Sequence, residues 1–129
     1  RSAAAFGVRQ VVLLKEAASP FHPKSIRASG GAVFRLSFFR GPSLAGVVQL
    51  PDMARDIVAL DMQGASIREC AFPERFLLLP GMEGQGLPDL LRHQAVAIPM
   101  TGAVESLNAA AAVSIALFCW SAGKPTAQP

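Results

Sequence analysis

Short apolar runs alternate with helix-like segments along the whole chain, and glycine or proline separates most of them. This alternation is typical of an α/β fold, in which helices connect parallel strands. We therefore predict a mostly parallel sheet with helices on both of its faces, in a single domain. The predicted strands are Gln10–Leu14, Leu36–Phe39, Asp56–Leu60, Arg75–Leu79 and Ala95–Ile98.

The longest apolar segment runs from Leu107 to Trp120, inside a helix that we predict to begin at Ser106. Apolar residues surround this helix instead of forming one stripe, so we expect it to be buried on all sides. The segment is too short to span a bilayer, and the N-terminus has no signal-peptide pattern, which together predict a cytoplasmic protein. Glycine and proline in residues 121–129 predict a flexible tail after a domain of residues 1–120.

The composition is unusually apolar for a chain of 129 residues, with 51% hydrophobic and 16% charged residues. A small domain buries a low fraction of its surface, so we expect a second subunit to cover part of this apolar area. The formal net charge of +3 and the isoelectric point near 9.4 permit an anionic partner without requiring one.

The two cysteines, Cys70 and Cys119, are far apart in the sequence, and only His22 and His93 could join them as metal ligands. A zinc site needs more ligands at closer spacing. We therefore predict two reduced, partly buried thiols and no metal site.

A glycine-rich turn, PGMEGQGL, follows a predicted strand at residues 80–87 and precedes a predicted helix, Pro88–Arg92. A dinucleotide-binding turn would follow the first strand of the sheet, whereas this one comes after at least three strands. It also lacks the GK[ST] sequence of a phosphate-binding P-loop. The glycines must serve another ligand or a tight crossing of the chain.

Four segments, in this order, closely resemble the SpoU/TrmH family of RNA ribose 2′-O-methyltransferases: RSAAAFGVRQVVLL, HPKSIRASGGAVFRL, LLLPGMEGQGL and IPMTGAVESLNAAAA. The resemblance covers nearly the whole chain. It implies S-adenosylmethionine as methyl donor, a tRNA or rRNA substrate, a deep C-terminal trefoil knot, and a homodimer formed through the last helix and the knot. The family's first strand, and an Asn six residues before the motif Arg, would precede Arg1, so we expect the domain to lack that strand.

The resemblance also implies roles for individual residues. Glu83, Ser106 and Asn108 match positions that line the family's pocket, and Arg1 matches the Arg that activates the ribose hydroxyl. The implied catalytic residues are Arg1, Glu83, Ser106 and Asn108; the implied cofactor contacts are Leu60, Gly81, Gly86, Ile98, Met100 and Leu107; and the implied RNA contacts are Arg27 and Ser29.

Chemistry refines the role of Arg1. Its guanidinium has a pKa above roughly 12, so it is a poor general base. We expect it to orient the hydroxyl and the adjacent phosphate, while that phosphate or water assists proton loss. Two alternatives to the enzyme stay open: a catalytically silent paralogue that binds S-adenosylmethionine and RNA, and a knotted dimerisation domain without a ligand.

Overall fold

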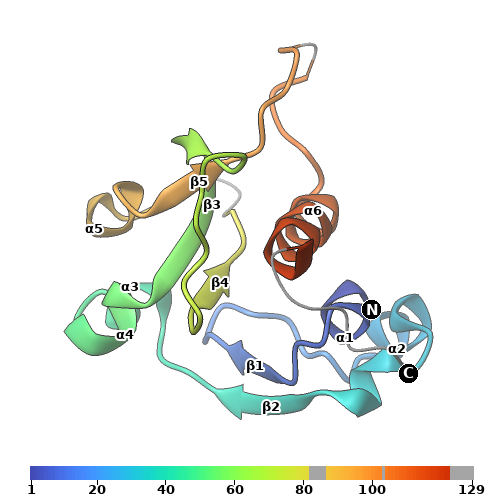
Figure 1. Cartoon of the computed structure of the whole chain (residues 1–129). Coiled ribbons are helices and arrows are strands. Elements are labelled where there is room, and N and C mark those ends of the chain that lie inside the picture. The colour runs from blue at the N-terminus through green and yellow to red at the C-terminus, as the bar shows by residue number, and fades with distance from the viewer. Residues whose placement is uncertain (82–86, 103, 123–129) are drawn as a thin grey trace.

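A computed structural model describes residues 1–81, 87–102 and 104–122 of the chain (Figure 1). Parallel strands and helices alternate within it, which confirms the predicted α/β class. The elements are α1 (Ser2–Ala5), β1 (Gln10–Leu13), α2 (Pro23–Ser29), the 3₁₀ helix η1 (Ala32–Arg35), β2 (Ser37–Arg40), α3 (Leu44–Val47), α4 (Pro51–Arg55), β3 (Ile57–Ser66), β4 (Leu77–Leu79), α5 (Asp89–Arg92), β5 (Ala95–Ala97) and α6 (Ala109–Ala122).

The strands form two parallel sheets, where the sequence predicted one. β1 pairs with β2 from Gln10↔Ser37 to Leu13↔Arg40, and β3 lies between β4 and β5 in the second sheet. Among the described residues no strand joins β1 to β4, so the prediction of a single sheet is wrong for this chain.

The three-stranded sheet has helices on both faces, as predicted. Side chains alternate between the faces of a strand, so neighbouring residues of β3 enter different cores. Ile57 and Ala59 pack with residues of α3, α4 and α5, whereas Val58 and Leu60 pack toward α6. Figure 1 shows α6 on the side of this sheet opposite α3, α4 and α5.

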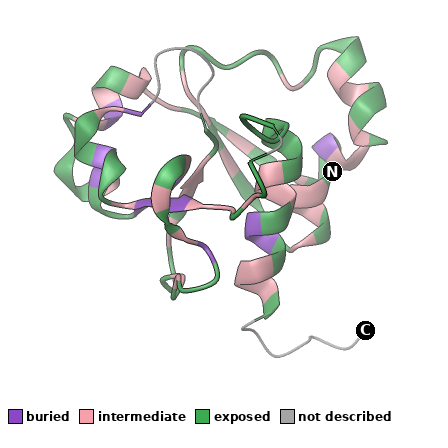
Figure 2. Ribbon diagram, turned by 90° about the horizontal axis from the view of Figure 1, so that it is seen from above, coloured by how far each residue is buried: buried purple, intermediate pink, exposed green. Residues whose placement is uncertain are grey.

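Helix α6 is less buried than its composition predicts. Ala116 and Leu117 are its buried residues, whereas the Phe118 side chain is 61% exposed, and Figure 2 shows a single buried band on this helix. One side packs on the sheet and another contacts α1, which leaves the remaining apolar surface open in the single chain. The expectation of burial on all sides is therefore wrong for one copy of the chain.

The ends of α6 also differ from the prediction. The helix begins at Ala109 instead of Ser106, because the Asn108 Oδ1 accepts hydrogen bonds from the N–H groups of Ala110 (2.9 Å) and Ala111 (3.3 Å) and so caps it. It continues through Ala122, two residues into the segment predicted as a tail, and the Ser121 hydroxyl donates to the Phe118 carbonyl at 2.9 Å. The rest of that segment, residues 123–129, lies outside the described residues.

Local signals explain the helices before β3. Ser43 is the N-cap of α3, and its hydroxyl accepts from the Gly46 N–H at 3.1 Å. Helix α3 ends at Val47, and a second helix, α4, starts with Pro51 at a first-turn position that suits proline. Gly7 follows α1 with a φ of 77°, as expected of a glycine that ends a helix.

Cys70 and Cys119 are free thiols and half-buried, as the sequence predicted. Burial raises the pKa of the Cys70 thiol above its usual value, because the thiolate would lose solvation. In the described part of the chain, no helix has the length and apolar character that crossing a membrane requires.

Candidate functional site

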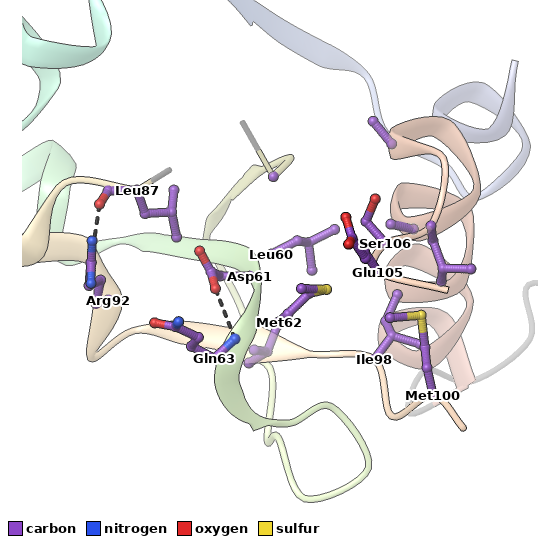
Figure 3. A pocket seen from close by; sticks show the side chains of 15 residues that line it. Leu60, Asp61, Met62, Gln63, Leu87, Arg92, Ile98, Met100, Glu105 and Ser106 are labelled. Carbon is purple, nitrogen blue, oxygen red and sulfur yellow. Dashed lines mark hydrogen bonds between the residues drawn. The ribbon is translucent and has the colours of Figure 1, made fainter. Parts of the chain in front are cut away.

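A cavity of about 640 Å³ lies between the three-stranded sheet and the beginning of α6 (Figure 3). This volume is within the usual range for small-molecule sites. Its walls come from β3, from the chain that follows β4, from the segment that leaves β5 and from the first turn of α6. The lining residues are Leu60, Asp61, Met62, Gln63, Gly81, Leu87, Arg92, Val96, Ile98, Met100, Glu105, Ser106, Leu107, Ala109 and Ala112.

An excursion in β3 brings polar groups to this cavity. Leu60 and Ala65 both pair with Val96 of β5, so the residues between them, 61–64, leave the sheet and return to the same point. The Asp61 Oδ1 accepts a hydrogen bond from the Gln63 N–H at 2.8 Å, which fixes the turn. We refer to residues 61–64 as the β3 excursion.

Gly64 closes the β3 excursion because no other residue fits there. A Cβ atom at this position would overlap the backbone carbonyl of Ala95 in β5. Glycine inside a strand marks such close approaches of two backbones. The excursion therefore has a defined shape, with Asp61, Met62 and Gln63 at the cavity.

Gly81 forms another wall through its backbone. A Cβ at this position would lie 3.0 Å from the carbonyl oxygen of Leu60, at the end of the regular part of β3. The chain that leaves β4 therefore passes closely over the end of β3. A ligand in the cavity meets peptide groups here with no side chain in between.

The segment after β5 supplies the opposite side of the cavity. Ile98 and Met100 contribute apolar surface, and Glu105 and Ser106 contribute polar groups. Figure 3 shows Leu60 and Met62 on one side of the cavity and Glu105 and Ser106 on the other. The cavity thus combines apolar walls with a few polar groups, which is the usual composition of a small-molecule site.

The charged groups of the cavity favour a ligand with positive charge. Asp61 and Glu105 each contribute a carboxylate. Arg92, the one cation among the described lining residues, is already engaged: its Nε donates to the Leu87 carbonyl at 3.3 Å and lies 3.2 Å from the Asp89 carboxylate. In the three described ranges no group of three or more His, Cys, Asp and Glu side chains is arranged to hold a metal ion.

Most of the residues predicted to bind the cofactor do line this cavity. Five of the six do so, and so does one of the predicted catalytic residues. Gly86 and Glu83 lie outside the described residues. The lining residues from the predicted sets are Leu60, Gly81, Ile98, Met100, Leu107 and Ser106.

The other predicted residues lie elsewhere. Asn108 caps α6, and Arg1 places its guanidinium near Gly30, where a Cβ would be 3.9 Å from a terminal nitrogen of Arg1. Arg27 is exposed on α2. The Ser29 hydroxyl donates to the Ile26 carbonyl at 2.8 Å and accepts from the Val33 N–H at 3.4 Å, so it joins α2 to η1.

Sequence reasoning did not identify Asp61, Met62, Gln63, Arg92 or Glu105 as lining residues. One usable signal was Gly64, because a glycine in an otherwise strand-like run indicates a bulge or a close contact. The predicted strand ends at Leu60, so Asp61, Met62 and Gln63 fall outside it and carry no signal of their own. Glu105 directly precedes the SLN sequence and carries no separate signal.

Comparisons with known proteins identify a family for this chain. The sequence model of the "SpoU rRNA Methylase family" matches residues 1–118. A Syntrophobacter fumaroxidans protein named "Ribosomal RNA small subunit methyltransferase G 2" is 53% identical over 94% of this chain and 24% of its own length. A Streptomyces viridochromogenes "23S rRNA (uridine(2479)-2'-O)-methyltransferase" is 34% identical over 92% of this chain and 45% of its own length.

Solved structures give the same result. The SpoU methyltransferase AviRb from Streptomyces viridochromogenes, in complex with AdoMet, has a TM-score of 0.78 and 33% identity over 95% of this chain and 50% of that chain. An AdoMet-bound rRNA methyltransferase from Sinorhizobium meliloti has a TM-score of 0.77 and 32% identity over 92% and 48%. The chain spans half or less of each of these four relatives. With the family's sequence model matched over residues 1–118 and the same fold in both solved structures, the chain belongs to the SpoU rRNA methylase family.

Proposed function

We propose that this domain transfers a methyl group from S-adenosylmethionine to a ribose 2′-hydroxyl of rRNA or tRNA. The observation that carries the proposal is the convergence of the β3 excursion, Gly81 and lining residues from the segment after β5 on one cavity. Two relatives support the chemistry, since AviRb and the Sinorhizobium meliloti enzyme were solved with AdoMet. The Streptomyces viridochromogenes relative is named as a 2′-O-methyltransferase of 23S rRNA.

The residues present fit this cofactor. Ile98, Met100 and Leu107 would bind the flat, largely apolar adenine, and the bare backbone at Gly81 would approach the nucleoside closely. The cofactor carries a positive sulfonium and amino group, and the carboxylates of Asp61 and Glu105 have the complementary charge. When bound, it supplies an electrophilic methyl group.

The protein's own contribution to this reaction is positioning. In-line transfer needs the acceptor oxygen near the methyl carbon in a site that excludes competing water. We propose that the Ser106 hydroxyl helps to orient substrate groups at the cavity and that Glu83 and Gly86 belong to the same binding loop. For Asn108 we propose a positioning role, because its cap fixes the start of α6 and hence the adjacent residues Ser106 and Leu107.

Arg1 retains its proposed role of orienting the ribose hydroxyl and the neighbouring phosphate. The reason is chemical, because a guanidinium binds phosphate well and accepts a proton poorly. In the single chain Arg1 lies beside Gly30, at the end of α2, and is not among the residues that line the cavity. Helix α2 itself carries Arg27 and Ser29, for which we propose contacts to the RNA.

We further propose the trefoil knot and a homodimer that uses the knot region and α6. The exposed Phe118 and the apolar residues around α6 support a subunit interface, because isolated domains rarely leave so apolar a helix open. The knot would require the loops at 81–86 and 98–108 to cross, and residues 82–86 and 103 lie outside the described part of the chain.

Two measurements test the function. Titration calorimetry with S-adenosylhomocysteine should show binding, and radiolabelled S-adenosylmethionine should label total RNA in a form that resists alkaline cleavage at one nucleotide. Arg1→Ala should abolish labelling and preserve S-adenosylhomocysteine binding, whereas Arg1→Lys should retain part of the rate. Binding without labelling of any RNA would indicate the silent paralogue, and no binding at millimolar ligand would contradict the proposal as a whole.

A further inference from the structure

A second cavity, of about 470 Å³, opens at the carboxyl ends of β1 and β2. Its walls are drawn from residues 13–21 and 38–41, and none of its lining residues lines the cavity near α6. We propose that this groove binds an unpaired nucleotide of the substrate RNA, next to the segment that enters the active site. The inference rests on the proposed function for the identity of the RNA substrate. We call this cavity the aromatic groove; its members used below are Leu14, Lys15, Phe21, Phe38, Phe39 and Arg40.

Exposed aromatic rings are the first observation. Phe21 is 51% exposed and Phe39 is 50% exposed, although both side chains line the aromatic groove. Phe21 meets Phe38 edge to face, with ring centroids 5.4 Å apart. About half of the Phe21 side chain thus remains open to a flat ligand, and proteins that bind single-stranded RNA stack bases on exposed aromatic rings.

The Phe21 ring stands on an ordered turn. The Phe21 N–H donates to the Ser19 hydroxyl at 3.3 Å, and the Ser25 hydroxyl donates to the Ser19 carbonyl at 3.4 Å. Just beyond, the Lys24 N–H donates to the His22 Nδ1 at 3.3 Å, so His22 caps the start of α2. Because these bonds fix the turn before any ligand arrives, little conformational entropy is lost when a base stacks on the ring.

Charge is the second observation, and it distinguishes this end of the chain from the rest. Residues 1–40 contain seven Lys and Arg and one acidic residue, whereas residues 41–129 contain five Lys and Arg and eight acidic residues. Lys15 and Arg40 belong to the aromatic groove itself. Residues 1–40 therefore form a strongly basic region, although the net charge of the whole chain is modest. A basic region of this kind is typical of an RNA-binding surface.

The cations of residues 1–40 are available to phosphate groups. In the described part of the chain, both ion pairs, Arg55–Asp52 and Arg92–Asp89, lie after residue 40. The one acidic residue of the basic region, Glu16, has a different partner, because its carboxylate accepts from the Leu44 N–H at 3.2 and 3.3 Å. It therefore does not neutralise Lys15 or Arg40 through an ion pair.

RNA explains this combination better than an apolar protein partner does. A purely apolar partner would leave Lys15 and Arg40 to be desolvated without a counter-charge, which is costly. A nucleotide supplies a planar base for Phe21 or Phe39 and a phosphate for the two cations. Unpaired nucleotides fit, because paired bases keep their faces stacked in the helix.

The test is the affinity for a labelled single-stranded RNA of about 12 nucleotides, measured by fluorescence anisotropy across a series of salt concentrations. Phe21→Ala should weaken binding about 5- to 150-fold, and Phe21→Trp should restore it, because a stacking surface returns. Arg40→Gln should lower the salt slope by about 0.7, the value for one phosphate contact on a single strand. A duplex of the same length should compete poorly.

Matched controls come from the same chain. Phe34→Ala removes a more exposed aromatic ring, 69% exposed, outside the aromatic groove, and Arg55→Gln removes a cation outside the basic region. Both should bind RNA like the unmodified protein. Thermal melting should show that Phe21→Ala and Arg40→Gln remain folded.

Each outcome decides the proposal separately from the methyltransferase function. Equal RNA affinities for Phe21→Ala and Phe34→Ala, or no RNA binding by the unmodified protein at about 100 µM, would contradict the proposal that the aromatic groove binds RNA. So would a change of oligomeric state in Phe21→Ala with unchanged RNA affinity, which would identify a subunit interface. S-adenosylhomocysteine calorimetry reports on the other cavity alone, so its failure leaves the result for the aromatic groove standing.

Discussion

The backbone of Gly81 lies so close to Leu60 that a Cβ atom at position 81 would be 3.0 Å from the Leu60 carbonyl oxygen. This contact joins the turn after β4 to the end of the regular part of β3, and both residues line the proposed cofactor cavity. The relationship makes position 81 sensitive to the smallest possible side chain.

Gly81→Ala should weaken S-adenosylhomocysteine binding by about tenfold, because the new methyl group must displace one wall of the cavity at a cost of about 1–3 kcal/mol. Titration calorimetry measures the change. Ala45→Ser, a change on the exposed face of α3 outside the cavity, is the control and should bind normally. Unchanged affinity in Gly81→Ala would show that this contact does not shape the ligand site.

Asp61→Asn should weaken binding of the positively charged cofactor by tenfold or more, since a hydrogen bond to a charged group contributes about 1.5–3 kcal/mol. Asparagine keeps an oxygen for the Gln63 N–H, so the β3 excursion should retain its turn. Calorimetric titration with S-adenosylmethionine measures the affinity, and Asp52→Asn, which removes an exposed carboxylate on α4, provides the matched control. If both variants bind alike, the carboxylate of Asp61 plays no part in recognition.

Asn108→Ala should reduce the free energy of unfolding by about 1 kcal/mol, because two N–H groups at the start of α6 lose their acceptor. Asn108→Asp should restore most of that loss, since aspartate is an equally good N-cap. Urea denaturation measures both. A stability loss that aspartate does not recover would argue against capping as the main role of this side chain.

Phe118→Glu should convert the proposed homodimer to a monomer, because a charge would be buried in an apolar interface. Light scattering after gel filtration reports the mass. Phe34→Glu places the same charge on another strongly exposed phenylalanine and should leave the oligomeric state unchanged. A dimer that survives Phe118→Glu would locate the interface elsewhere.

The fold class and much of the cavity could be predicted from the sequence, because they depend on local patterns. All five strands occur close to their predicted positions, and the glycine-rich turn does lead into the site through Gly81. Ile98, Met100 and Leu107, which the family motifs imply as cofactor contacts, line one cavity.

The sequence could not reveal features that depend on distant contacts. The apolar–polar pattern ends at Leu60, so nothing local shows that the strand resumes at Ala65 beside Val96. The division into two sheets depends on which strands are neighbours in space. The apolar composition of the helix that contains Leu117 predicts burial on all sides. Periodicity does not distinguish a helix inside a core from a helix with an apolar surface that is exposed in the single chain.

The return of β3 to the same residue of β5 has a consequence for how this domain can vary. Since Leu60 and Ala65 share Val96 as neighbour, the ladder of the sheet does not run through positions 61–63. Substitution there changes what a bound molecule encounters while the hydrogen-bonded framework keeps its register. Gly64 is the exception, because the loop returns to the framework through that residue. Ligand preference and folding are thereby assigned to separate, adjoining stretches of a single strand.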